Sequence, residues 1–350
     1  MTDRDIYALR GPVRTCRLQR TWYSRQCGPD ACETEERTDI TDLEFRPDGS
    51  LARRCHVNPD GSKWNANYDY DATGRPTAIR TEGQAGLVDL LLHEYDSAGR
   101  LVRINSQPHG GPGRVAENYE YDSAGRKKKT QYIDLAALPP DTEFFWATEG
   151  SGGGYAAPGA TTLTTFYNLS GQPIDLHFQD RDGRLVSRVE FSYDRDGNMI
   201  EEAQTNTAET LRAEMLASLN LAQLETVKAL FGANGEPLRT THQYNEQGRR
   251  VGTRSRMGPL GEDGKTMTYN DRGDQIGETL EHQEREYGID EEGRFADTPA
   301  SESRVRSEAN FRYEYDTQGN WVTKSIESRG AVDRAFTLSS IERRTLSYFE

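Results

Sequence analysis

Aromatic and aliphatic residues alternate with polar residues along much of this chain, with a period of two. The clearest aromatic sets two positions apart are Tyr68 and Tyr70, Tyr119 and Tyr121, Phe191 and Tyr193, and Phe311, Tyr313 and Tyr315. A period of two places such residues on one face of a β-strand and their polar neighbours on the other. The pattern therefore predicts strands that each have one apolar face.

A short motif follows many of these strands. It reads aromatic, Asp or Asn, two variable residues, Gly, and then usually Arg or Asn, as in Tyr95–Arg100 and Tyr121–Arg126. Asp can accept a hydrogen bond from a backbone N–H two residues later, and Gly adopts φ > 0 without steric cost. The motif predicts a type I turn closed by a left-handed glycine, which joins two antiparallel strands. A role for the aspartates as metal ligands is the alternative. The predicted turn formers are Asp71 and Gly74, Asp96 and Gly99, Asp122 and Gly125, Asp194 and Gly197, Asn245 and Gly248, Asn270 and Gly273, and Asp316 and Gly319.

The spacing of the turn glycines predicts the topology. Many lie 12 to 14 residues apart, as Gly49, Gly61 and Gly74 do, and others lie 25 or 26 residues apart. The short interval fits one strand of about seven or eight residues and one turn. In the long intervals a less regular turn is visible, as at Gly83–Gly86. We therefore expect a mainly β fold, a long twisted antiparallel meander of about twenty strands.

The repeated motif resembles the YD-repeat family, also called Rhs-type repeats, whose units read Y-D-x-x-G-R/N-L. The resemblance covers about residues 45–321. It implies long, spiralling β-sheets. Large members of that family form hollow shells around a toxin and carry a D-P-x-G-L motif, which this sequence lacks. The chain is more similar to the short, stand-alone bacterial members, for which the resemblance implies no catalytic residues.

The pattern predicts a single repeat-built β domain over residues 1–350. Its predicted parts are an opening hairpin segment (6–45), repeats (45–133, 162–204 and 233–321), two interruptions (134–161 and 206–232) and closing strands (322–350).

The first interruption is rich in Pro and Gly, which break strands, and we expect a mobile surface loop there. Its aromatic cluster, Phe144, Phe145 and Trp146, would either bind a partner or fold back over the sheet. The second interruption predicts an amphipathic helix over about 207–231. Asn206 can cap this helix and Gly232 can end it. Such a helix would cover the open apolar face of the sheet or bind a partner.

All four cysteines lie in the first 55 residues. Cys27 and Cys32 enclose a turn signal, so a disulfide across that hairpin is geometrically reasonable. Cys16 and Cys55 would remain on strands of the same sheet. A zinc site that combines cysteines with His56 is an alternative, but the spacing lacks a C-x-x-C pair.

Composition narrows the function classes. The formal net charge of −14 disfavours nucleic acid as a partner, because such binding depends on Lys and Arg. Lys127, Lys128 and Lys129 directly follow a turn, and we expect a solvated strand end. The sequence contains no apolar stretch that would insert into a membrane and no signal peptide. These features leave the localisation unknown, cytoplasmic by default and extracytoplasmic if a leader was removed.

No catalytic motif is visible in the sequence, and no cofactor is expected. None of the six histidines sits in H-E-x-x-H, and no G-x-S-x-G appears. We therefore expect a non-catalytic scaffold or binding protein that presents an extended sheet surface to a protein or a glycan. The alternative is a glycan hydrolase that uses two carboxylates on a sheet face, about 5 to 9.5 Å apart.

Overall fold

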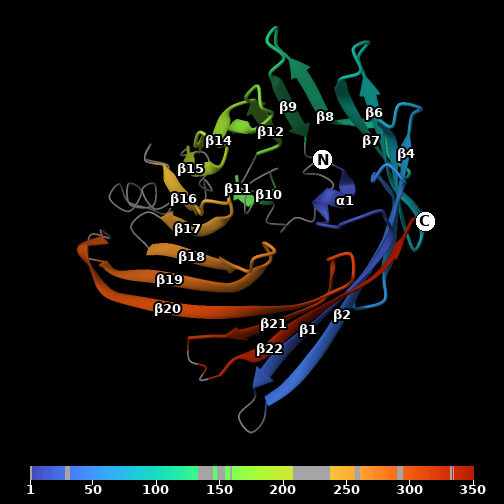
Figure 1. Ribbon diagram of the computed structural model, residues 1–350. Helices are drawn as coiled ribbons and strands as arrows, with labels where there is room; N and C mark the ends of the chain where they lie inside the picture. The colour runs from blue at the N-terminus through green and yellow to red at the C-terminus, as the bar shows by residue number, and fades with distance from the viewer. Residues whose placement is uncertain are drawn as a thin grey trace. The chain divides into compact units, whose positions relative to one another are not determined.

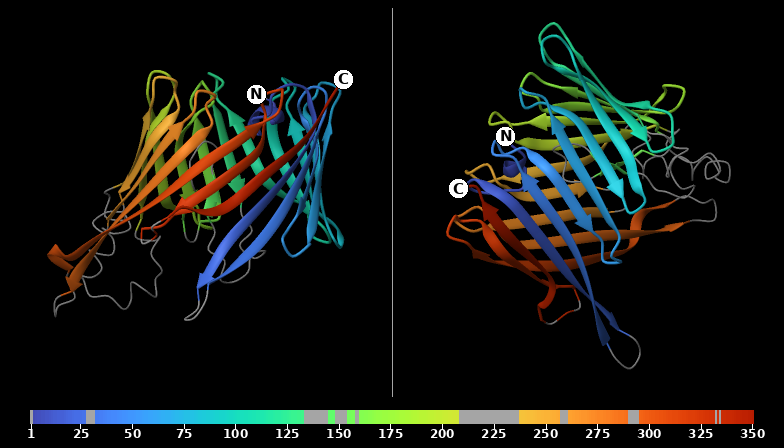
Figure 2. Two further views of the ribbon diagram at one scale, coloured as in Figure 1. Left: turned by 60° about the horizontal axis from the view of Figure 1, so that its bottom comes forward. Right: turned by 90° about the vertical axis from the view of Figure 1, so that its right-hand side faces the viewer.

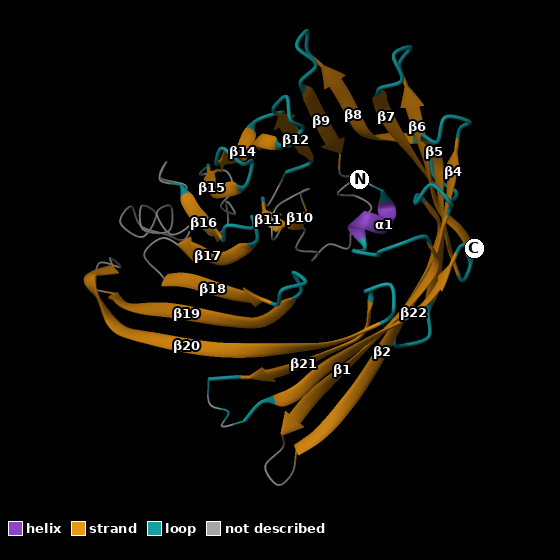
Figure 3. Cartoon of the chain, viewed as in Figure 1, coloured by secondary structure: helices purple, strands orange, loops and turns teal. Residues whose placement is uncertain are grey.

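Strands dominate the computed structural model (Figure 3). It describes residues 2–27, 32–132, 145–147, 154–157, 160–207, 237–256, 261–289, 295–331, 333 and 335–350. Within these residues the helical part is one short helix, α1 (Asp3–Ile6). The expectation of a mainly β fold is therefore confirmed. The predicted helix at 207–231 lies, except for Thr207, outside the described residues.

The chain divides into two compact units. The first unit comprises Met1–Val115, Asp274–Gly277 and Glu308–Glu350, and the second comprises Ala116–Gly273 and Glu278–Ser307. The sequence pattern predicted a single repeat-built domain and indicated no such division. β19 (Gln275–Ile289) and β20 (Phe295–Tyr315) contribute residues to both units.

The first unit is built of antiparallel neighbours. Its strands are β1 (Val13–Cys27), β2 (Cys32–Phe45), β3 (Leu51–Val57), β4 (Lys63–Tyr70), β5 (Pro76–Gly83), β6 (Gly86–Tyr95), β7 (Leu101–Pro108), β21 (Trp321–Arg329), β22 (Thr337–Tyr348) and the last part of β20 (Figure 1). From β1 to β7 each strand pairs with the next along the chain. β20, β21 and β22 pair in the same sequential way. β22 also pairs with β1, so the two ends of the sequence meet side by side.

The β1–β2 hairpin extends beyond its neighbours in this unit (Figure 2, left). The ladder between β22 and β1 stops at Trp22, and the ladder between β3 and β2 stops at Ile40. Farther out, the two strands pair with each other until Cys27 lies opposite Cys32. The outer part of this hairpin is therefore a two-stranded ribbon.

Strands of the second unit also pair with their neighbours along the chain. The pairing skips the residues between β9 and β12 and those between β15 and β16. Its strands are β8 (Arg114–Tyr121), β9 (Lys127–Tyr132), β10 (Phe145–Ala147), β11 (Gly154–Ala156), β12 (Thr162–Tyr167), β13 (Pro173–Gln179), β14 (Leu185–Tyr193), β15 (Met199–Asn206), β16 (Leu238–Tyr244), β17 (Arg250–Arg256) and β18 (Gly261–Tyr269), with most of β19 and β20. β9 pairs directly with β12, and β15 pairs directly with β16. β10 and β11 form a separate two-stranded sheet.

β20 contains a stretch of sequence without apolar alternation. Residues 297–306 are largely polar, yet they lie within the 21 residues of β20. The signal used for strands was an apolar face, and this part of β20 instead carries charged residues such as Glu302, Arg304 and Arg306. The last of these lies 3.8 Å from Glu281 of β19. Charged residues that pair across neighbouring strands give no apolar alternation, so the sequence does not indicate a strand there.

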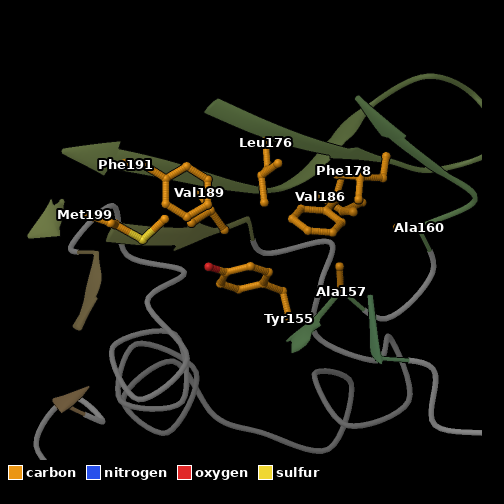
Figure 4. Packing of buried hydrophobic residues seen from close by; sticks show 10 residues of the cluster. Tyr155, Ala157, Ala160, Leu176, Phe178, Val186, Val189, Phe191 and Met199 are labelled. Atoms are coloured by element: carbon orange, nitrogen blue, oxygen red, sulfur yellow. The ribbon is translucent and has the colours of Figure 1, made fainter. Parts of the chain in front are cut away.

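A buried apolar cluster occupies one face of the second unit (Figure 4). Leu163, Leu176, Phe178 and Val189 are completely buried there. Tyr155, Ala157 and Ala160 come from the Pro/Gly-rich interruption and are also buried in this cluster. The expectation of a surface loop is thus wrong for these three residues. The sheet's apolar face attracts them because burying it removes about 25 cal/mol of unfavourable free energy per Å².

The first unit has a smaller buried cluster, formed by Leu9, Val13, Cys16, Leu43, Phe45 and Leu51. The N-terminal segment covers it, because Tyr7 packs edge-on against Phe45 at 6.1 Å between ring centroids. In each unit, a segment that does not belong to the repeats closes the apolar face.

Candidate binding site

A cleft of about 520 Å³ lies in the first unit, at the base of the extended β1–β2 hairpin. It is lined by Trp22, Ser24, Glu35, Arg37 and Pro59. The strand register explains the grouping, because Trp22 lies opposite Arg37 and Ser24 lies opposite Glu35. Alternation along β1 and β2 then places these four side chains on one face.

Trp22 is unusually exposed for its size, at 37% of its surface. The Arg20 guanidinium lies 5.7 Å from the centre of its ring system, within cation–π range. Arg20 is in turn bound to Glu342 at 3.1 Å, so the charge beside the indole is already paired. Arg20 and Arg37, the described cations near the indole, are thus both paired with carboxylates.

The polar wall of the cleft is one ion pair. Arg37 donates two hydrogen bonds to Glu35, of 2.8 and 3.2 Å. These hydrogen bonds raise the pKa of the Arg37 guanidinium above its usual value. A fork-to-fork pair of this kind holds both groups in one plane and leaves their outer edges available to a ligand.

The predicted turn residues share one geometry. The turn glycines at 74, 99, 125, 197, 248, 273 and 319 have φ between +71° and +93°. At the turn that begins with Asp96, the Gly99 N–H donates to the Asp96 carbonyl at 2.9 Å. The Asp96 carboxylate accepts the N–H groups of Ala98 and Arg100 and the Arg100 side chain. These contacts lower the pKa of Asp96, the hydrogen bond from the Arg100 backbone being the largest cause.

The tyrosine of the motif has a role that the sequence reading missed. The Tyr95 hydroxyl donates to the Pro76 carbonyl at 2.7 Å, immediately after the preceding repeat turn. The Arg75 guanidinium of that turn lies 4.7 Å from the Tyr95 ring centre. The same hydroxyl-to-carbonyl bond recurs from Tyr70 to Leu51, Tyr193 to Pro173, Tyr244 to Met199, and Tyr269 to Arg250. We call this set of linked turns the turn ladder. The Tyr and its acceptor lie 19 residues apart in three of these five bonds and 20 apart in a fourth, and this spacing was the available signal.

A buried polar network lies beside the apolar cluster of the second unit. His242 on β16 contacts Glu202 on β15 at 2.8 Å and Thr253 on β17 at 3.2 Å. The Tyr155 hydroxyl donates to the same Glu202 carboxylate. Burial alone would raise the pKa of Glu202, but the hydrogen bonds from His242 and Tyr155 lower it overall. No sequence motif marked this network.

The chemistry of this network is structural. The donors around Glu202 hold the ionised carboxylate in place, as a buried charge requires. Glu202 is 9% exposed and His242 is 6% exposed, so neither presents a reacting atom to solvent. The network ties β11 to β15, β16 and β17. His242 thus links β16 to both of its neighbouring strands.

Cys16 and Cys55 lie in different environments. Cys16 lies opposite Leu43 and Cys55 lies opposite Asp42, so the two side chains are on opposite faces of the sheet. Burial raises the pKa of Cys16 to about 11. Within the described residues, no cluster of His, Cys, Asp and Glu is arranged to hold a metal ion.

The predicted disulfide remains a prediction. The backbone register puts Cys27 directly opposite Cys32. Opposed residues of antiparallel strands have Cα atoms about 4.5 to 5.5 Å apart, a separation that a disulfide can bridge.

The solvated strand end expected at the three lysines is wrong for one of them. Lys129 is only 8% exposed, and its ammonium group lies 3.1 Å from Glu117. The strand alternation turns Lys129 toward the buried face, opposite Tyr119.

The predicted partner-binding aromatics are only partly placed. Phe144 lies outside the described residues, and the structure places Phe145 and Trp146 in β10 by their backbone positions.

No protein-family model and no curated protein matches this chain. Among solved structures, the TcdB2–TccC3–Cdc42 complex is similar at 11% identity and a TM-score of 0.24, over 92% of this chain. This chain spans only 19% of that one. A porin-like protein from Bacteroides uniformis is similar at 9% identity and a TM-score of 0.33, over 97% of this chain and 98% of the other. TM-scores this low carry no argument about fold or function. None of the described helices has the length and hydropathy of a transmembrane helix.

Proposed function

We propose that this chain is a non-catalytic binding protein of the YD-repeat type. Its repeats would form a twisted antiparallel meander, with the helix predicted at 207–231 inserted between β15 and β16. The sheet surface would be presented to a glycan or a protein, and the Trp22 cleft is the site we assign to that partner.

The exposed indole of Trp22 beside the planar Arg37–Glu35 pair is the observation that supports this function. An exposed aromatic face stacks on the apolar face of a sugar ring, while forked polar groups bind hydroxyls. Binding is favoured over hydrolysis because, among the lining residues that the structure describes, Glu35 is the one carboxylate. A glycosidase of the usual kind needs two.

The test is binding of neutral oligosaccharides, measured by glycan array and then by calorimetry. We expect Trp22→Ala to weaken binding about tenfold or more, because stacking on an anchor residue usually carries much of the affinity. Tyr132→Ala is the matched control, since Tyr132 is an aromatic residue of the second unit with 44% exposure.

Equal weakening by both variants would remove the Trp22 cleft from the proposal. Release of shortened oligosaccharides during the measurement would overturn the non-catalytic reading. If no glycan binds, the remaining partner is a protein, and its capture must then depend on Trp22.

A further inference from the structure

The outer edge of β2 is a surface that the proposed function does not use. β2 pairs with β1 as far as the hairpin tip, but its ladder with β3 ends where Ile40 meets Val57. There β3 enters a tight turn, in which the Asn58 N–H donates to the Ser62 carbonyl at 2.8 Å. In the ladders that the structure describes for β2, residues 32–39 are therefore paired on one side only (Figure 2, left).

Strand alternation identifies the backbone groups on this edge. Just beyond the other end of β2, the Arg46 N–H donates to the Ser50 carbonyl, which lies on the β3 side. Alternate residues of a strand direct their N–H and C=O groups to the same side. The register of β2 against β1 runs without a shift, and the irregularity against β3 adds its extra residue to β3. Thr34, Glu36 and Thr38 therefore direct their backbone groups to the side that β3 leaves open.

These backbone groups select the kind of ligand. An edge strand presents N–H donors and carbonyl acceptors in a regular row, and the complement of that row is another extended backbone. A two-stranded ribbon is only marginally stable in water, so a third strand would stabilise the outer part of the β1–β2 hairpin. The edge thus fits an extended peptide segment.

Charge restricts which peptide the edge accepts. Residues 23–27 and 32–39 contain four carboxylates and two arginines, so the formal net charge of the ribbon is −2. Arg37 is already paired with Glu35 through two hydrogen bonds, and Asp39 lies 4.0 Å from His56. Glu36, on the edge itself, is exposed. Like charges that lie opposite each other on neighbouring strands are destabilising, so a basic strand is favoured over an acidic one.

The same charges disfavour a second copy of this chain as the occupant. Two identical strands that pair antiparallel about a twofold axis place one residue opposite itself. A pairing centred on Glu35, Glu36 or Arg37 sets that charge against its own copy, and one centred on Thr34 sets Glu33 against Glu35. The edge therefore suits a partner strand of different sequence.

We propose that the free edge of β2 binds an extended basic peptide, which adds a third strand to the β1–β2 ribbon. Backbone groups of Thr34, Glu36 and Thr38 pair with the peptide backbone, and its lysine or arginine side chains lie beside Glu36. These three residues do not line the Trp22 cleft. The peptide site is therefore separate from the proposed function.

The experiment is fluorescence anisotropy of the full chain with a capped, labelled octapeptide of alternating lysine and threonine. One comparison peptide has glutamate in place of lysine, and the other keeps the lysines but is N-methylated at every residue. The parent peptide should bind. Both comparison peptides should bind at least about tenfold more weakly, because one carries the wrong charge and the other lacks backbone donors.

Two variants of one residue test the edge itself. Thr34→Pro removes one outward N–H, at an edge position where proline is tolerated, and should weaken peptide binding about fivefold, the usual net value of one hydrogen bond. Thr34→Ala is the matched control, because it removes the side chain and keeps the N–H, and it should bind like the unmodified chain. Far-UV circular dichroism checks that both variants fold.

Three results would overturn the site. They are equal binding by Thr34→Pro and Thr34→Ala, binding of the N-methylated peptide as tight as that of its parent, and a chain that is dimeric alone but monomeric as Thr34→Pro. The last result would assign the edge to a second copy. The peptide measurement involves no glycan, so a negative glycan array would leave its result standing.

Discussion

The turn ladder and the buried face of the second unit are stabilised in opposite ways. Each turn of the ladder repeats one set of local hydrogen bonds, such as those that Ala98 and Arg100 donate to Asp96 within the same turn. The buried face instead depends on single contacts between distant segments, such as Tyr155 with Glu202. Damage to one turn should therefore remain local, whereas damage to the buried face should loosen several strands at once.

The largest effect is expected from Phe178→Ala on the buried face. Phe178 is completely buried against Tyr155, with ring centroids 6.2 Å apart. Its truncation should lower the free energy of unfolding by about 3–5 kcal/mol, through lost burial and a residual cavity. Urea denaturation measures the loss, and hydrogen exchange should show reduced protection across β12 to β15. A loss confined to β13 would contradict the contrast with the ladder.

A smaller effect is expected from Gly99→Val in the ladder. Gly99 has φ of +77°, where a β-branched residue is strained by about 1–3 kcal/mol. Hydrogen exchange should show lost protection within about two strands. Gly125→Val is the matched variant, because its φ is +84° and a Cβ there meets nothing within 4 Å. A Cβ at Gly99 would lie 2.8 Å from Arg75 Nη1, so any excess cost at Gly99 reports that contact.

Removal of single hydroxyl groups compares the two regions directly. Tyr95→Phe removes the bond to Pro76 and should cost about 1 kcal/mol, the usual net value of a neutral hydrogen bond. Tyr70→Phe and Tyr269→Phe should cost similar amounts if the ladder is one repeated device. Tyr155→Phe should cost more, about 1–3 kcal/mol, because it deprives a buried carboxylate of a donor. Equal losses at Tyr95 and Tyr155, measured by urea denaturation, would remove the distinction.

Acid should weaken the ladder gradually. The pKa values of Asp71, Asp96, Asp122, Asp194 and Asp316 are all lowered in the folded protein. A carboxylate with a lowered folded-state pKa stabilises the fold above its unfolded pKa of about 4, and this stabilisation is lost as pH falls toward the folded value. Urea denaturation midpoints, measured from pH 6 to pH 2, should therefore decrease once the pH drops below about 4. Asp96→Asn should flatten this pH dependence more than the control Asp182→Asn. The Asp182 carboxylate makes one long, exposed contact of 3.8 Å with Arg184. Identical profiles would show that the turn carboxylates are not responsible.

The repeat turns were predictable because their chemistry is local. The Asp and Gly of each turn lie within four residues of each other, and alternation is a property of a single strand. Strand existence, antiparallel neighbours and the face of most aromatic residues follow from these two patterns. The polar part of β20 is not marked by this alternation, because its charged residues give no hydrophobic period.

The remaining features depend on contacts between residues that are distant in sequence. Tyr155 is buried because an apolar face on β12 to β14 was open to it, and nothing in a Gly-rich segment announces that partner. The Trp22 cleft depends on where β22 and β3 stop pairing with the β1–β2 hairpin.

The sequence by itself therefore determined the strands and the turns, since those bonds join near neighbours along the chain. The tertiary structure decided which faces were buried and where charged side chains met, because packing energy depends on which surfaces meet and not on their order in the chain.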